Sequence, residues 1–293
     1  MNTNNDINSC YYLQDKLSLN KITFNSKCFF HFAWRGYTDI KELLPDASNY
    51  SSYFFRCSKN ERKEKFKLFE ELHRVYGWFD KINKLGLYPY PMPKIFQSGN
   101  LNEAFLNKII ENIKIYPQSD DDLLQVLSFI QHKFQGTSLI DFSDNFFKAL
   151  YFAIGKRENW DKSDTHLMGI DLSYFTWLKE PFGFDVYRPS YFMNKRIENQ
   201  EGLFIYQKFK IPEEDQTEYK NLYNYFEDEI NKHNWIKVTF DDIKDWKPNP
   251  NNLLYCDITI PKEEKSKLHG FLEFVGIDYN LLFCDIEKMP WEK

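Results

Sequence analysis

The chain has few cysteines and histidines, and neither residue type is spaced as metal ligands usually are. Its 293 residues include five Cys and six His, with no Cys-x-x-Cys and no His-x-x-x-His pattern. The cysteines are Cys10, Cys28, Cys57, Cys256 and Cys284. An odd number at irregular spacing indicates reduced thiols and not a disulfide framework. We therefore expect a cytoplasmic protein without a metal site.

Long apolar runs and an excess of basic residues are also absent. No stretch approaches the roughly 20 apolar residues that cross a bilayer, and the polar N-terminus lacks the apolar core of a signal peptide. The formal net charge is −5. A chain of this charge has no overall attraction to nucleic acid or to an anionic membrane, although a local basic groove is compatible with it. We expect no membrane partner.

Aromatic residues, in contrast, are abundant. The sequence contains 28 Phe, 19 Tyr and 7 Trp. Rings bury large apolar areas, so a ring-filled core is the first interpretation, and a stacking surface for a base or nicotinamide is the alternative. The length is sufficient for a well-buried core in one large domain or in two small ones.

The stretch 131–153 combines polar residues capable of chemistry with a dense apolar run, and its hydrophobic period changes in the middle. Residues 139–142 predict a short buried strand, whereas from Asp144 onward apolar residues recur at three and four positions, which predicts a helix. We expect Ser143 or Asp144 to cap this helix by accepting a hydrogen bond from its first turn. A polar turn before a helix N-terminus is a common position for a ligand.

Arg35 is expected at the end of a central strand. Residues 28–34 alternate with apolar side chains on both faces, which predicts a strand inside a sheet. Gly36 follows, where the backbone needs a positive φ or approaches a ligand closely. The guanidinium of Arg35 offers five donors in a fixed fork, which suits a pyrophosphate. A structural ion pair at the strand end is the alternative for Arg35.

Two further titratable residues lie near the change of period. Ser119 is expected to cap a helix over residues 119–134, so that His132 lies at its C-terminal end. The helix dipole favours a charged imidazole there, which can donate to a ligand, and a helix-capping role is the alternative. Asp141 lies within an otherwise apolar strand. It is a candidate acid, or a buried carboxylate partnered by a backbone turn.

The remaining periodic segments complete an α+β order of elements. We expect helices over residues 61–76, where Gly77 ends the helix, 101–113, 212–233 and from 261, and strands over residues 167–172, 203–209, 235–240, 253–260 and 281–286. The ring-rich segment 177–191 is either a lid over a pocket or a packed surface loop. We expect residues 1–20 to be loosely ordered, residues 21–293 to form one domain, and residues 58–130 to form a helical insertion.

Several motifs, in the expected order, resemble the signature of the FRG domain. Trp-Arg-Gly at residues 34–36 is similar to the Phe-Arg-Gly for which that family is named. The other matching residues are Leu43–Pro45, Gln131, His132, Thr137, Leu139, Asp141, Phe142, Ser143, Ala149–Ala153, Arg196, Ile197, Gln200, Gly202–Phe204, Val275–Ile277 and Leu282–Asp285. Departures occur at Tyr37, Phe134, Gly136 and Ser138, where the family usually has Gln, Gly, Pro and Arg. They bear on the shape of a pocket more than on the fold.

The resemblance implies an α+β fold with an ADP-ribosyltransferase-like core. That core is a mixed or antiparallel sheet with helices packed on it, and it implies NAD as the substrate. Arg35 would hold the NAD, and Glu201 would face the nicotinamide ribose. The catalytic residues implied are Arg35, His132, Asp141, Gln200 and Glu201, and the NAD contacts are Arg35, Gly36, Gln131, Thr137, Ser143, Tyr151 and Arg196.

The implied chemistry is cleavage of the nicotinamide–ribose bond, whose oxocarbenium-like transition state a carboxylate stabilises. Glu201 is the first choice for that carboxylate and Asp141 the second. FRG-like proteins occur in bacterial conflict, which implies a toxin or phage-defence effector. A protein or nucleic-acid acceptor and a cognate inhibitor or antitoxin are the partners implied. An NAD glycohydrolase, and a non-enzymatic module that binds a nucleotide or a nucleic-acid end and acts through a partner, are the alternatives.

Overall fold

The chain adopts an α+β fold around one large mixed sheet. The computed structural model describes residues 9–22, 31–38, 65–86, 115–116, 121–134, 137, 139–155, 157–174, 184–190, 195–207, 209–210, 222–243 and 252–283. Over these residues, an eight-stranded sheet has the order β6-β7-β4-β2-β5-β10-β1-β9, and a separate two-stranded sheet joins β3 to β8.

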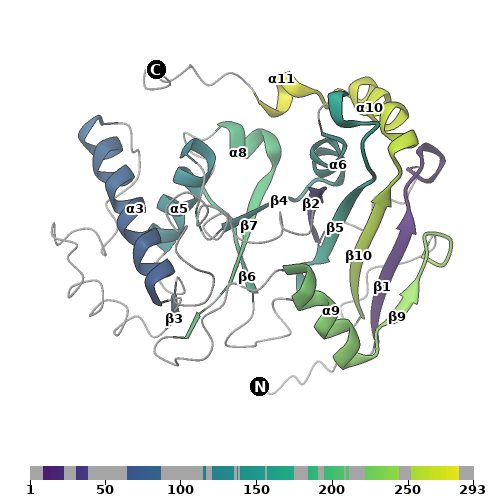
Figure 1. Ribbon diagram of the computed structural model, residues 1–293, viewed down its shortest axis with the longest axis horizontal. Helices are drawn as coiled ribbons and strands as arrows, with labels where there is room; N and C mark the ends of the chain where they lie inside the picture. Colours follow the sequence, from purple (N-terminus) through teal and green to yellow (C-terminus); the bar gives the residue numbers. More distant parts are fainter. Residues whose placement is uncertain are drawn as a thin grey trace.

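The elements have the following bounds. The strands are β1 Ser9–Lys16, β2 Phe32–Tyr37, β3 Ile115–Tyr116, β4 Leu139–Ser143, β5 Thr165–Asp171, β6 Phe184–Tyr187, β7 Gly202–Gln207, β8 Phe209–Lys210, β9 Ile236–Val238 and β10 Asn252–Ile260. The α-helices are α3 Lys65–Lys84, α5 Asp121–Phe134, α6 Phe146–Ile154, α8 Lys195–Gln200, α9 Leu222–His233, α10 Lys265–Phe274 and α11 Tyr279–Leu282. In Figure 1, β5, β10, β1 and β9 run side by side, with α3 and α5 at the other end of the molecule.

The sheet is mixed because β1 runs parallel to both of its neighbours, β10 and β9. The remaining pairings in the sheet, from β6 through to β10, are antiparallel. The mixed α+β fold expected from the sequence is therefore confirmed. β2 lies between β4 and β5, as its apolar residues on both faces predict.

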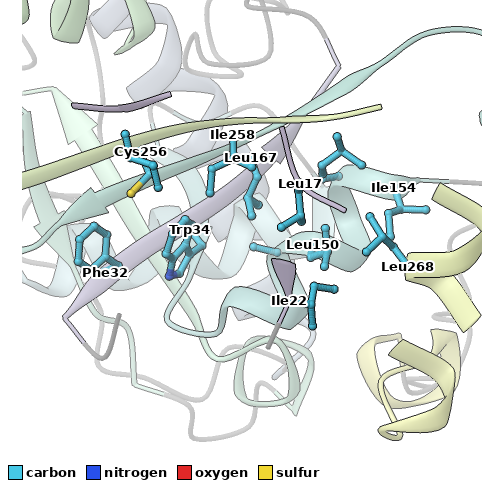
Figure 2. Packing of buried hydrophobic residues seen from close by; sticks show 14 of the residues in the cluster. Leu17, Ile22, Phe32, Trp34, Leu150, Ile154, Leu167, Cys256, Ile258 and Leu268 are labelled. Carbon is cyan, nitrogen blue, oxygen red and sulfur yellow. The ribbon is translucent and has the colours of Figure 1, made fainter. Parts of the chain in front are cut away.

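One face of the sheet, here called the α6 face, carries the larger core. Phe32 and Trp34 of β2 pack there with Leu167 of β5 and with residues of α6 and α10. Figure 2 shows Trp34 and Phe32 beneath Cys256 of β10, with Leu150 of α6 close by. The indole of Trp34 meets the ring of Phe146 edge-on, at a centroid distance of 5.0 Å. Strand alternation places these side chains on a common face.

The opposite face, here called the α9 face, carries a second core. Ala33 and Tyr37 of β2 pack there with Met168 of β5 and Tyr255 of β10. Tyr225 and Phe226 are the large residues that α9 contributes, and Phe226 stacks on Tyr255 at 4.6 Å between ring centroids. Burial on both faces explains why β2, β5 and β10 have nearly continuous apolar sequences.

Two expectations about the N-terminal part of the chain and the first long helix are wrong. Residues 9–16 are not loosely held but form β1, an interior strand whose Leu13 is completely buried. α3 does not end at Gly77 but continues to Lys84, because Val75, Phe79 and Ile82 maintain a buried helical stripe beyond the glycine. Glycine inside a helix lowers its stability without forcing it to end.

Two further local predictions need correction, and one gains detail. Within 281–286, the described residues up to Leu282 belong to α11 and not to a strand, because Asp278 caps this helix by accepting from the N–H of Leu281. The N-cap of α6 is Asn145, and neither Ser143 nor Asp144. The ring-rich segment 177–191 contains a strand, β6. The helix expected over 101–113 and the cap at Ser119 lie outside the described residues.

Candidate functional site

The large sheet divides into two parts beside the residues that the sequence singled out. β2 pairs with β5 along its whole length, and β4 pairs with β7 along its whole length, but β2 and β4 pair only through Trp34 and Ser143. A three-stranded part (β6, β7 and β4) is thus joined to a five-stranded part (β2, β5, β10, β1 and β9) by one residue pair. Figure 1 shows both parts. The row Trp34–Ser143–Gly202 crosses the junction.

Arg35 directly follows the pair that joins the two parts. Its Nη1 donates to the backbone carbonyl of Asp141 in β4, at 2.5 Å. The side chain is half-buried, and alternation along β2 places it on the α9 face with Ala33 and Tyr37. A guanidinium fixed in this way connects β2 to β4 where their backbones do not pair. Arg35 lies inside β2, two residues before its end, and not at the end of the strand as expected.

Gln131, Thr137 and Asp141 form a second connection, between α5 and β4. Nε2 of Gln131 donates to a carboxylate oxygen of Asp141 at 3.0 Å. Oε1 of the same amide accepts from the backbone N–H and from the hydroxyl of Thr137, at 2.9 and 2.8 Å. The buried amide of Gln131 is thereby satisfied on both sides. The structure brings these three predicted residues together, with Arg35 one hydrogen bond away on the backbone of Asp141.

Ser143 is the centre of a third set of contacts, at the end of β4. Its buried hydroxyl donates to the carbonyl of Gln200 at 2.7 Å and accepts from the N–H of Asn145 at 3.0 Å. The amide of Gln200 is also buried, and it donates to the carbonyl of Leu282 at 3.2 Å. Ser143 and Gln200 therefore hold the start of α6, the end of α8 and α11 together. The hydrogen bonds described here give Ser143 and Gln200 a structural role.

Glu201 lies next to Gln200, with its backbone in the left-handed region at a φ of 47°. Its carboxylate accepts from Nζ of Lys148 in α6 at 2.7 Å and from Nδ2 of Asn145 at 3.4 Å. The Glu201 side chain is 45% exposed, whereas that of Lys148 is only 10% exposed. A ligand can therefore reach the carboxylate, while the ammonium beneath it offsets part of the negative charge.

A second ion pair lies next to this one. Both terminal nitrogens of Arg188, which follows β6, donate to the two carboxylate oxygens of Asp144, with Nη2 at 2.9 Å from Oδ1. The backbone N–H of Asp144 also donates to the carbonyl of Glu201 at 2.9 Å. The start of α6 is thus held from two sides by charged groups. The cap itself is neutral, because Oδ1 of Asn145 accepts from the N–H groups of Phe147 and Lys148.

Gly36 has a steric role in this fold. A Cβ placed on it would come within 2.3 Å of the backbone nitrogen of Ala153 in α6. The close approach expected at Gly36 is therefore to a helix of the same chain. It also means that the Trp-Arg-Gly motif and the Ala-Leu-Tyr-Phe-Ala motif pack directly against each other.

Tyr151 and Arg196 make their described contacts elsewhere. The ring of Tyr151 faces His269 of α10 at 5.7 Å, and burial raises the pKa of its hydroxyl. The guanidinium of Arg196 lies over the ring of Phe283 at 5.1 Å. None of these contacts brings Tyr151 or Arg196 to Asp141. His132 belongs to α5, next to Gln131, but its side chain lies outside the described residues.

Sequence reasoning did not select Asn145, Lys148 or Arg188, although each contacts a predicted site residue or its neighbour at the start of α6. Asn145 carries the strongest available signal, since Asn is a favoured N-cap directly before an apolar helical run. Lys148 and Arg188 carry none, because a single basic residue in a helix or loop is ordinarily a solvated charge.

The comparison with protein families matches one segment of this arrangement to a known domain. The model of the FRG domain matches residues 51–162 of the chain. The match includes α5, β4 and α6 and their residues Gln131, Thr137, Asp141 and Ser143. Arg35 precedes the matched segment, and Glu201 follows it. No curated protein and no solved structure matches the chain.

Membrane-spanning helices and metal clusters are not found in the described part of the chain. Within those ranges, no helix is both long and apolar enough to cross a membrane. Among the same residues, no three His, Cys, Asp or Glu side chains are grouped so as to hold a metal ion.

Proposed function

We propose that this FRG-domain protein binds NAD where the sheet divides and cleaves its nicotinamide–ribose bond, on a core of ADP-ribosyltransferase type. One observation carries the proposal. The row Trp34–Ser143–Gly202 crosses the junction, and it is flanked by Arg35 on β2 and by Glu201 ahead of β7. A cation suited to a pyrophosphate and a carboxylate suited to an oxocarbenium ion thus lie beside the same few backbone atoms.

The residues would act as follows. Arg35, fixed by the carbonyl of Asp141, would orient the pyrophosphate. The bond between the ribose C1′ and the nicotinamide nitrogen would break, and its electron pair would leave with the nicotinamide. Glu201 would stabilise the positive charge that develops on the ribose. Because Lys148 offsets the charge of Glu201, this stabilisation is complete only when their ion pair opens.

The acceptor of the ADP-ribosyl group defines the biological role. A protein or nucleic acid as acceptor would make the chain a transferase, and water as acceptor would make it an NAD glycohydrolase. The match to the FRG domain covers residues 51–162. By resemblance to FRG-like proteins of bacterial conflict, the chain would act as a cytoplasmic toxin or in phage defence and would be restrained by a cognate inhibitor or antitoxin.

The test measures nicotinamide release from NAD by the full chain, together with the mass of the chain and of added host proteins and nucleic acid. Arg35→Ala should weaken NAD binding, whereas Glu201→Gln should bind nearly normally and react roughly a hundred- to a thousandfold more slowly. Arg157→Ala is the matched control, since Arg157 lies over Trp160, outside the contacts described for the junction. If wild type and all three variants release nicotinamide at the rate of a protein-free blank, the enzyme proposal is wrong.

A non-enzymatic nucleotide-binding module is the second candidate, and one observation favours it. The carboxylate of Glu201 is already engaged by Lys148 and Asn145, which is how a structural ion pair is satisfied. Such a module would bind NAD or a terminal nucleotide through Arg35 and leave it intact. Binding that depends on Arg35 without any nicotinamide release would select this candidate.

A further inference from the structure

A cluster of titratable side chains lies on the α9 face of the five-stranded part, outside the contacts described so far. At its centre is Asp257 of β10, which is 6% exposed. One carboxylate oxygen accepts from the hydroxyl of Tyr37 in β2 at 3.0 Å, and the other accepts from the hydroxyl of Tyr12 in β1 at 3.4 Å. Three strands thus converge on one buried carboxylate. Its apolar neighbours in sequence, Cys256 and Ile258, point to the α6 face.

His166 of β5 forms the accessible side of the cluster. Its Nδ1 lies 4.0 Å from Oδ1 of Asp257, and its side chain is 35% exposed. The imidazole stacks on the ring of Tyr37 at 5.2 Å, with 24° between the planes. His166 pairs with Thr259 of β10, and Lys16 of β1 follows in the same row. These residues are half-buried or exposed, so the cluster meets solvent at this end of the sheet.

One buried hydroxyl of the cluster lacks a hydrogen-bond partner among the residues that the structure describes. Tyr255 lies two residues before Asp257 on the same face and is 2% exposed, and its hydroxyl is the group concerned. Its ring stacks on Tyr12 at 5.5 Å. Burial and then the charge of Asp257 raise the pKa of Tyr255. A buried hydroxyl is nearly always bonded, so an unused one beside a carboxylate indicates a place for a ligand's polar group.

The cluster lies on the same face of the sheet as Arg35. Arg35 and Asp257 both pair with Met168, one from each side. Two strand spacings therefore separate their backbones, which is about 10 Å. Tyr37 is two residues beyond Arg35 on the same strand, about 7 Å away. These backbone separations place Arg35 and the cluster near enough on one face of the sheet for a single nucleotide to contact both.

The chemistry of the cluster selects a flat ring with N–H donors. The carboxylate of Asp257 accepts, the phenols both donate and accept, and the Tyr37–His166 stack presents an aromatic face. A phosphate would be repelled by the carboxylate of Asp257, and a purely apolar ring would leave the hydroxyl of Tyr255 without a partner. An amino group or carboxamide on a heteroaromatic ring fits all of these groups.

We propose that Tyr37, His166 and Asp257 bind the nitrogen-bearing ring of a nucleotide whose phosphate is held by Arg35. This inference rests on the nucleotide ligand of the proposed function, and it adds where the ring lies and which residues recognise it. Adenine and the carboxamide of nicotinamide share the required chemistry. The test therefore includes one ligand that carries only the adenine end of NAD and one that carries only the nicotinamide end.

The test is titration calorimetry of the full chain with NAD, ADP-ribose, nicotinamide mononucleotide and inorganic pyrophosphate. His166→Ala changes a partly exposed side chain, and Asp257→Asn removes the charge at the centre. Both substitutions should lower the affinity for the ring-bearing ligand by about ten- to a hundredfold and leave the affinity for pyrophosphate within about twofold of wild type. Arg35→Ala should lower the affinity for pyrophosphate as well. ADP-ribose loses affinity if the ring is adenine, and nicotinamide mononucleotide loses it if the ring is nicotinamide.

Tyr279→Phe and Asp242→Asn are the matched controls, because both residues are exposed and lie on α11 and after β9. Circular dichroism and thermal melting verify that each variant is folded, and His166→Ala alone decides the matter if Asp257→Asn does not fold. Unchanged affinity for every ring-bearing nucleotide in folded variants overturns the inference, as does wild-type protein that binds no nucleotide. Nicotinamide release is measured separately, so ring binding without cleavage rejects the enzyme proposal and leaves this one standing.

Discussion

Gly36 and Ala153 bring β2 and α6 so close together that a side chain at position 36 would overlap the backbone of the helix. A Cβ on Gly36 would lie 2.3 Å from the nitrogen, and 2.5 Å from the Cα, of Ala153. These obstructing atoms belong to the backbone in the last turn of a helix packed in the core, so they cannot rotate away as a flexible side chain could. The position of Arg35, the residue before Gly36, therefore depends on a glycine at position 36.

Gly36→Ala should destabilise the protein by about 3 kcal/mol or more, the upper end of the cost of overpacking a core. Chemical unfolding in urea measures this change. Gly270→Ala is the control, because Gly270 lies in α10 and a methyl group added to it would meet no atom within 4 Å. That substitution should stabilise by roughly 0.5–1 kcal/mol through helix propensity. Equal effects of the two substitutions would show that α6 can move away from β2.

Ser143→Ala should cost about 1–3 kcal/mol. The substitution leaves the carbonyl of Gln200 without its donor and the N–H of Asn145 without its acceptor, in a buried position. Ser128→Ala is the control, because the equally buried hydroxyl of Ser128 bonds to the carbonyl of Gln125 within the same helix, α5. Alanine favours the helix there, so the change should stay within about 0.5 kcal/mol. A Ser143→Ala protein as stable as the control would contradict the structural role of this hydroxyl.

Lys148→Met should change stability by less than about 1 kcal/mol, although Lys148 itself is buried. Its partner Glu201 is nearly half-exposed, so water can solvate the carboxylate once the ammonium is gone, and the methionine fills the same space. Urea unfolding at low and high salt measures the change and its screening. Lys195→Met, in the exposed pair with Glu198, is the control and should have no measurable effect. A loss of several kcal/mol for Lys148→Met would mean that Glu201 is held away from solvent.

The local hydrophobic pattern predicted the segment from β4 to α6, which carries most of the candidate site. The change of hydrophobic period near Asp144 marks the junction between β4 and α6 to within two residues, because a period of two and a period of 3.6 differ over even a short window. The alternating apolar residues before Arg35 similarly predicted an interior strand, which is β2. Where a prediction failed, a local signal was outweighed by packing, as at Gly77 inside α3.

Contacts between strands could not be predicted in the same way. The hydrogen bond from Arg35 to the carbonyl of Asp141 joins residues 106 apart, and the bond from Tyr37 to Asp257 joins residues 220 apart. Both depend on strand order and register, which no single segment encodes. For this reason Asp141 was selected from the sequence by its motif, whereas Asp257, in an equally apolar strand, was not.

The stability of the protein should depend on pH through Asp257. Burial is the largest influence on this carboxyl group and raises its pKa above the ordinary 3.8, although Tyr37, His166 and Tyr12 act in the opposite direction. The folded chain therefore retains the proton at a pH where the unfolded chain has released it. Stability should fall as pH rises from about 3.8 to the raised pKa, by at most about 1.4 kcal/mol for each pH unit, and should then level off.

Asp257→Asn should remove this part of the pH dependence, because an amide does not titrate. The free energy of unfolding of wild type and variant, measured in urea from pH 3.5 to pH 7, should therefore differ least at the acidic end. Asp242→Asn is a control of opposite sign. Hydrogen bonds from Thr239 lower the pKa of Asp242, so its contribution is present above the ordinary pKa and is lost as pH falls. A constant difference between wild type and Asp257→Asn over the whole range would mean that Asp257 ionises as readily in the fold as in the unfolded chain, and that water reaches it freely.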